Sequence, residues 1–106
     1  VGGNRSLSSY ADLSTVRKSG DMVKMWSLTD FRTADVFADT VYLSAKAHEE
    51  YDCKEEKKRM LAYSFHSGNM GGGVVVYAEP DPDDKWAPIP SGSTIATLWK
   101  VACGKP

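Results

Sequence analysis

The chain has 106 residues, of which 42% are hydrophobic, 10% aromatic and 25% charged, the proportions of an ordinary globular domain. Thirteen Lys and Arg residues against fourteen Asp and Glu give a formal net charge of −1, which excludes an overall basic field for nucleic acid or anionic lipid. The longest apolar run, residues 74–78, is far shorter than the ~20 residues of a membrane-spanning helix. We therefore expect one domain over residues 1–106, with no nucleic-acid partner and no transmembrane segment.

Two strands joined by a tight turn are indicated first. Residues 9–18 combine apolar residues with β-tolerant Ser and Thr, and residues 22–28 follow directly after a short segment of turn composition, KSGD. This pattern predicts a β-hairpin, with Trp26 on the face opposite Val23 and Met25. Residues 30–40 carry three aspartates and are expected to form a connecting loop, with or without a helical turn capped by Asp35.

The middle of the chain also favours strands. From residue 41 to residue 48, apolar residues alternate with polar or aromatic ones, which predicts a strand with one buried, apolar face and one solvated face. A charged turn is expected after Cys53, followed by a strand to about His66. A helix over residues 45–61 is the competing interpretation, because Ala, Lys, Glu and Leu are all helix formers.

Glycine and proline mark the next boundaries. Residues 66–73 include four glycines and an asparagine, which predicts a wide hairpin turn into a strand at residues 74–79. Pro80 and Pro82 end that strand, because proline cannot donate to a sheet ladder. Residues 86–92 are expected to form an extended approach to the last element.

The last element is the clearest helix. Ser93 is a good N-cap, Gly104 occupies the position after the C-cap, and one stripe carries Ile95, Leu98, Trp99 and Ala102. We therefore predict an α+β fold, in which a mostly antiparallel β-sheet of about five or six strands carries a C-terminal α-helix packed on it.

No motif indicates catalysis. The glycine-rich segment lacks the GK[ST] of a phosphate-binding loop and precedes a strand rather than a helix, so a turn is predicted. His48 and His66 are candidates for an acid–base or metal site, but neither a GxSxG motif nor a Ser/His/Asp order accompanies them. We expect them to be surface or hydrogen-bonded histidines.

Three further groups receive a structural interpretation. A calcium loop counted from Asp81 would need Gly and Glu where Trp86 and Gly92 stand, so a solvated turn is predicted there, which includes Asp83 and Asp84. The basic excess of residues 54–59 is too small for a nucleic-acid patch. The tryptophans are expected to be core or surface anchors first: Trp26, Trp86 and Trp99. No catalytic, cofactor-binding or metal-binding residue is therefore predicted, and no cofactor.

The two cysteines, Cys53 and Cys103, leave three possibilities open. They could hold a structural zinc ion only if His48 and His66 completed the four ligands. They could instead be buried free thiols of a cytosolic protein. The third possibility is one long-range disulfide, which implies an oxidising compartment.

Three segments, in this order along the chain, resemble motifs of the surface-adhesin protein E family of Gram-negative bacteria. They are YADLSTVR at 10–17, EYDCK at 50–54, and WAPIPSGS at 86–93 with its continuation through Leu98-Trp99 to Val101-Ala102-Cys103. The resemblance implies an exported protein, located in the periplasm, on the outer membrane surface or secreted. It also implies a mostly antiparallel sheet with a small packed helix, and a disulfide that joins Cys53 to Cys103.

The resemblance further implies a non-enzymatic function. The family's named member is an outer-membrane adhesin that captures host matrix and plasma glycoproteins through a Lys- and Arg-containing stretch just before the first cysteine, whereas residues 40–52 offer only Lys46 and are otherwise acidic. We predict an adhesin-like binding domain whose partner is a protein or glycoprotein of the host matrix or the envelope. The alternatives are a structural or stress-related envelope protein, able to form a homodimer through a sheet edge, and a small enzyme or enzyme inhibitor that uses the loop at residues 68–73.

Overall fold

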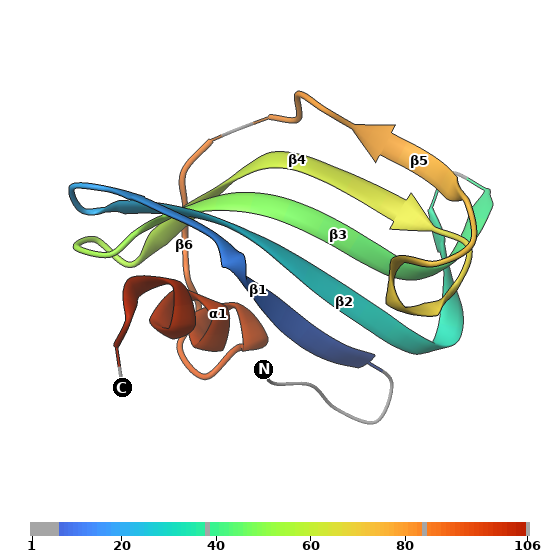
Figure 1. The fold of residues 1–106 in the computed structure, drawn as a ribbon, viewed down its shortest axis with the longest axis horizontal. Helices are drawn as coiled ribbons and strands as arrows, with labels where there is room; N and C mark the ends of the chain where they lie inside the picture. The colour runs from blue at the N-terminus through green and yellow to red at the C-terminus, as the bar shows by residue number, and fades with distance from the viewer. Residues whose placement is uncertain (1–6, 38, 84, 106) are drawn as a thin grey trace.

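The described part of the chain folds into an antiparallel sheet with a helix packed against it (Figure 1). The computed structural model describes residues 7–37, 39–83 and 85–105. The strands follow one another in chain order, and a short last strand pairs with β4. The elements are β1 (Leu7–Ser19), β2 (Met22–Phe37), β3 (Thr40–Asp52), β4 (Lys57–His66), the 3-10 turn η1 (Asn69–Gly71), β5 (Val75–Glu79), β6 (Ala87–Pro88) and α1 (Thr94–Cys103). The predicted fold class is thus confirmed.

The β1–β2 hairpin forms as predicted, but the connecting loop expected at residues 30–40 is wrong. β2 continues to Phe37 and pairs with β3 up to Asp30 and again from Asp35, with a shift of register between the two. This irregularity places more residues on β2 than on β3, and a bulge of this kind tolerates the polar residues that suggested a loop. Asp35 caps no helical turn, because its carboxylate accepts hydrogen bonds from the Val36 amide and the Tyr42 hydroxyl.

The residues after the second strand also form strands, so the competing helix over residues 45–61 does not form. The expectation of one buried apolar face is wrong for the first part of β3. Val41 is 56% exposed, whereas Ser44 is fully buried. The loop between β4 and β5 explains the burial, because the Ser44 hydroxyl donates to the Gly68 carbonyl and accepts from the Gly71 amide.

Helix α1 covers one end of one face of the sheet, near the β1–β2 and β3–β4 turns (Figure 1). Its predicted caps are present, since the Ser93 hydroxyl accepts from the Ala96 amide and Gly104 is left-handed at φ 67°. The buried core consists of Val23, Met25, Tyr51, Leu98, Trp99 and Ala102. A disulfide joins Cys53, just after β3, to Cys103 at the end of the helix, with 5.6 Å between their Cα atoms.

The register divides the sheet into two faces. Directly opposed residues of an antiparallel pair lie on the same face. Val23 and Met25 pack against α1 and define what we call the helix face. The alternate residues of β2, from Lys24 to Asp30, and their partners on β1 and β3 therefore lie on the other side, which we call the open face.

Candidate functional site

An open groove of about 540 Å³ lies on the open face, mainly between β1 and β2. A local irregularity of β1 shapes it, because the pairing of β1 with β2 shifts between Asp12 and Arg17. The residues that matter for its chemistry are Tyr10, Asp12, Thr15, Trp26, Leu28 and Lys46. The volume falls within the roughly 300–1,000 Å³ of small-molecule sites.

Side chains hold the irregular part of β1 in place. One carboxylate oxygen of Asp12 accepts from both the amide and the hydroxyl of Ser14. The Thr15 hydroxyl donates to the Asp12 carbonyl and accepts from the Trp26 amide, at 2.7 and 2.9 Å. A threonine hydroxyl therefore replaces a backbone carbonyl as the partner of Trp26, which fixes β1 at the edge of the groove.

The indole of Trp26 forms one wall of the groove. It stacks on the imidazole of His48, its partner on β3, with ring centroids 4.8 Å apart and planes inclined by 5°. Its partner on the other side is Asp12 of β1. Because His48 covers one ring face, the other ring face is turned toward β1 and lines the groove. Burial, and then the positive charge of Lys24, lower the pKa of His48 below its ordinary 6.5, which favours the neutral form of the stacked imidazole.

Several polar groups around the groove have no partner within the described residues. These are the hydroxyl of Tyr10, the second carboxylate oxygen of Asp12, the indole N–H of Trp26 and the ammonium of Lys46. Tyr10 is 42% exposed. No side-chain N or O atom of the described chain is both fully buried and unpaired, so these groups reach solvent. The groove thus combines an aromatic wall with free hydrogen-bond donors and acceptors.

The two histidines do not form a common site. His48 lies opposite Ala62, whereas His66 lies opposite Ser44, further along the sheet. His66 is buried and its Nε2 lies 2.9 Å from the Ser64 hydroxyl. Burial, and then Lys46, lower its pKa. The described residues hold no group of three or more His, Cys, Asp or Glu that could bind a metal ion.

The glycine-rich segment is a turn whose amides are already engaged. The Asp30 carboxylate accepts from the Met70 amide at 2.7 Å and from the Asn69 side chain at 3.1 Å. The Ser44 hydroxyl accepts a hydrogen bond from the Gly71 amide. Because side chains of β2 and β3 bind these donors, the loop presents no cradle for a phosphate. Asp81 and Asp83 are exposed in the following turn, and Asp84 lies outside the described residues.

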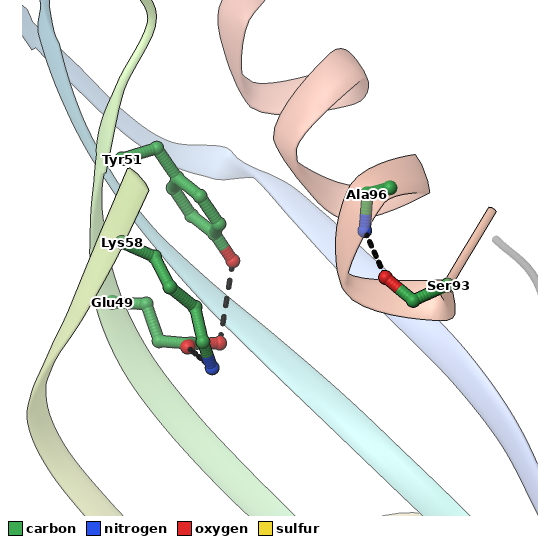
Figure 2. A network of polar contacts seen from close by, with 5 residues as sticks. All are labelled: Glu49, Tyr51, Lys58, Ser93 and Ala96. Carbon is green, nitrogen blue, oxygen red and sulfur yellow. Dashed lines mark hydrogen bonds and ion pairs between the residues drawn. The ribbon is translucent and has the colours of Figure 1, made fainter. Parts of the chain in front are cut away.

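Two of the acidic residues before Cys53, Glu49 and Glu50, form ion pairs with basic residues after it. Glu49, only 3% exposed, forms an ion pair with Lys58, and Glu50 pairs with Arg59. Figure 2 shows Glu49, Lys58 and Tyr51 projecting from β3 and β4 toward the side of α1. The Tyr51 hydroxyl donates to Glu49 at 3.3 Å, and burial raises the pKa of Tyr51 far above its ordinary value. The contacts of Glu49, Tyr51 and Lys58 stabilise the helix face, and Glu50 and Arg59 neutralise each other on the open face.

The tryptophans occupy three different environments. Trp99 is buried in the core, and its indole donates to the Asp52 carbonyl at 2.9 Å. Trp86 is 38% exposed and lies against the Arg59 guanidinium. Trp26 was expected to be an anchor, and sequence reasoning missed its place in a groove. The remaining groove residues were not predicted, because the irregularity of β1 that brings them together has no proline or glycine to mark it.

A family model described as "Surface-adhesin protein E" matches residues 1–104. The crystal structure of protein E from non-typeable Haemophilus influenzae aligns with a TM-score of 0.69 and 11% identity, over 94% of this chain and 71% of that chain. Another structure of Haemophilus influenzae protein E gives a TM-score of 0.67 and 13% identity, over 92% and 80%. At these identities the likeness shows a shared fold. A search of curated proteins gives no match. Among the described residues, no helix has the length and apolar character to cross a membrane.

Proposed function

The chain belongs to the surface-adhesin protein E family, and from that membership we propose that it is an exported binding domain without catalytic activity. Its partner is a protein or glycoprotein of the host matrix or of the envelope, and residues 1–106 act as one unit. The location that fits this function is the cell envelope or its surface. The disulfide between Cys53 and Cys103 supports an oxidising compartment.

The observation that carries the proposal is the groove on the open face. Its wall and rim contain Trp26 and Tyr10, and both residue types are enriched where proteins bind partners. The free polar groups beside them gain hydrogen bonds only when a ligand or water meets them. A surface that combines aromatic area with unpaired donors and acceptors is suited to recognition.

The features that could have supported catalysis are engaged in structural contacts. His48 stacks on Trp26 and His66 lies beside the Ser64 hydroxyl. The glycine-rich turn gives its amides to side chains of the sheet. These contacts support the non-enzymatic assignment over the alternative of a small enzyme that uses this loop.

Binding to immobilised matrix and plasma glycoproteins, measured by surface plasmon resonance with the oxidised protein, tests the proposal. We expect saturable binding that weakens at least about tenfold, or ~1.4 kcal/mol, in Tyr10→Ala or Trp26→Leu. Trp86→Leu removes an exposed tryptophan outside the groove and should bind like the unaltered protein. Absence of binding to any of these proteins and to envelope extracts, or catalytic turnover that is lost on substitution of His48 or His66, would overturn the proposal.

A further inference from the structure

We propose that the groove on the open face binds a neutral saccharide, with one pyranose ring lying against the free face of Trp26 and its hydroxyls meeting Tyr10, Asp12 and Lys46. This inference rests on the proposed function and gives it a ligand, since it places the recognised chemistry in the glycan of a glycoprotein partner.

The first argument is the free ring face. The face of an aromatic ring carries partial negative charge, which attracts the C–H groups that line one side of a pyranose ring. Trp26 offers such a face toward β1, while His48 covers the opposite face at 4.8 Å. The stack also holds the indole in place before a ligand arrives. Little side-chain freedom is therefore lost on binding, which favours affinity for a small ligand.

The second argument is the mixture of polar groups. The free oxygen of Asp12 accepts hydrogen bonds, Lys46 and the indole N–H donate them, and the Tyr10 hydroxyl does both. Sugar hydroxyls also both donate and accept, so one saccharide can satisfy all four groups. A purely apolar ligand would remove these groups from water and leave them unpaired, which is costly.

The charges argue against the other ligand classes. A carboxylate, Asp12, stands beside Trp26 on the neighbouring strand, which disfavours an anionic ligand. Single-stranded nucleic acid would need a positively charged track beside its stacking residues, and Lys46 is the one basic residue that lines the groove in the described chain. A neutral ligand with many hydroxyls fits this balance of charge.

The size and openness of the groove suit a glycan attached to a larger molecule. Its volume of about 540 Å³ exceeds what one sugar ring occupies, which leaves space for a second unit. The groove is open to solvent and is lined by residues of β1, the edge strand of the sheet. A glycan chain can therefore continue into solvent toward the protein that bears it.

Titration with neutral oligosaccharides, followed by NMR, tests the inference. The probes are lactose, N-acetyllactosamine, maltotriose and chitotriose, each added to the oxidised protein up to about 10 mM, which covers weak affinities. We expect at least one to shift the indole N–H signal of Trp26 in a saturable way, while those of Trp86 and Trp99 stay in place. Tyr10→Ala and Trp26→Leu should each weaken binding at least about tenfold, and Trp86→Leu should not.

A second arm separates this inference from the proposed function. A glycoprotein that binds the protein is tested again after enzymatic removal of its glycans. Loss of binding to the deglycosylated form supports the saccharide inference. Undiminished binding to that form, or no response of Trp26 to any of the four probes, overturns the inference and leaves the proposed protein-binding function standing. A groove that takes up only an apolar peptide overturns it as well.

Discussion

The indole of Trp99 donates its N–H to the backbone carbonyl of Asp52, at 2.9 Å. The next residue, Cys53, is bonded to Cys103. The last residue of β3 and the residue that follows it thus hold α1 against the helix face, one through a hydrogen bond and one through a covalent bond. The helix completes the core around Val23 and Met25, so these attachments bear directly on stability.

Loss of the disulfide should lower thermal stability strongly. The bridge closes a loop with a sequence separation of 50, for which loop entropy gives an upper figure of about 4 kcal/mol. We expect reduction, or the double variant Cys53→Ser/Cys103→Ser, to lower Tm by more than about ten degrees, at ~4–8 °C per kcal/mol. Differential scanning calorimetry measures the shift. Thiol titration of the denatured, unreduced protein is the control, and two free thiols per chain would contradict the prediction.

Stability should fall as the pH drops below about 6.5, the ordinary pKa of histidine. His48 and His66 both have pKa values lowered by burial, so the unfolded chain binds protons more readily than the folded chain. The resulting loss of folding stability is absent above the pKa of the unfolded state. It grows as the pH falls toward the pKa of the folded state. Tm measured between about pH 7.5 and pH 5.5, where ordinary carboxylates stay ionised, should decline.

Two substitutions separate the causes of this pH dependence. His48→Phe keeps an aromatic ring beside Trp26 but cannot be protonated, so Tm should vary less with pH. Lys24→Met removes the second cause of the lowered pKa of His48 and should reduce the variation in part. An unchanged pH profile in His48→Phe would show that His48 does not contribute.

Removal of Lys58 should destabilise the protein because Glu49 is buried. Lys58→Met leaves an uncompensated carboxylate on the helix face, 3% exposed and bonded to Tyr51. We expect a loss of roughly 2–4 kcal/mol in chemical denaturation, toward the lower end because Lys58 is itself partly exposed. The double variant Glu49→Gln/Lys58→Met removes both charges and should recover most of the loss. Equal losses in the single and double variants would count against an ion-pair effect.

Alanine should be tolerated differently at two left-handed glycines. Gly20 has a φ of 60° and open space where a Cβ atom would lie. Gly20→Ala should therefore lower the free energy of unfolding only by the cost of placing alanine in the left-handed conformation, roughly 1–2 kcal/mol. At Gly73, φ 69°, a Cβ atom would lie 2.8 Å from the Gly68 amide nitrogen and closer still to the Ser67 hydroxyl. Gly73→Ala should therefore cost a further ~1–3 kcal/mol from steric overlap. Urea denaturation of the two variants gives the comparison, which fails if both lose the same stability.

Heparin should not retain the protein at physiological salt. Lys58 and Arg59 are paired with Glu49 and Glu50, and exposed single charges such as Lys46 are screened beyond about 8 Å. We expect elution in the unbound fraction of a heparin column. Retention that resists about 0.15 M salt would contradict this expectation.

The elements with strong local signals could be predicted from the sequence. Ser93, Gly104 and the apolar stripe between them determine α1, and the KSGD turn determines the first hairpin, because these signals act within a few residues. The extension of β2 through Asp35 could not be predicted, since a bulge leaves no local signal apart from polar residues that also suit a loop. The burial of Ser44 depends on a loop more than twenty residues away, which periodicity within one strand cannot reveal.

The groove was inaccessible to sequence reasoning for a similar reason. Trp26 and His48 lie far apart in sequence and meet only through the register of β2 and β3. Nothing in the sequence around Thr15 indicates that its hydroxyl accepts a hydrogen bond from the Trp26 amide. The family resemblance implied the fold and the cysteine pair, but its basic stretch is missing here, so the resemblance did not indicate where this chain binds.

The order of the strands has a consequence for how the protein reaches its folded state. Because β1 to β5 pair in chain order, each strand can add to the sheet as the chain emerges from a ribosome or an export channel. Val23, Met25 and Tyr51 are nevertheless left without a cover until residues 94–103 become available. Until α1 is available, the emerging chain exposes this apolar surface. A holding chaperone would bind the chain in that state.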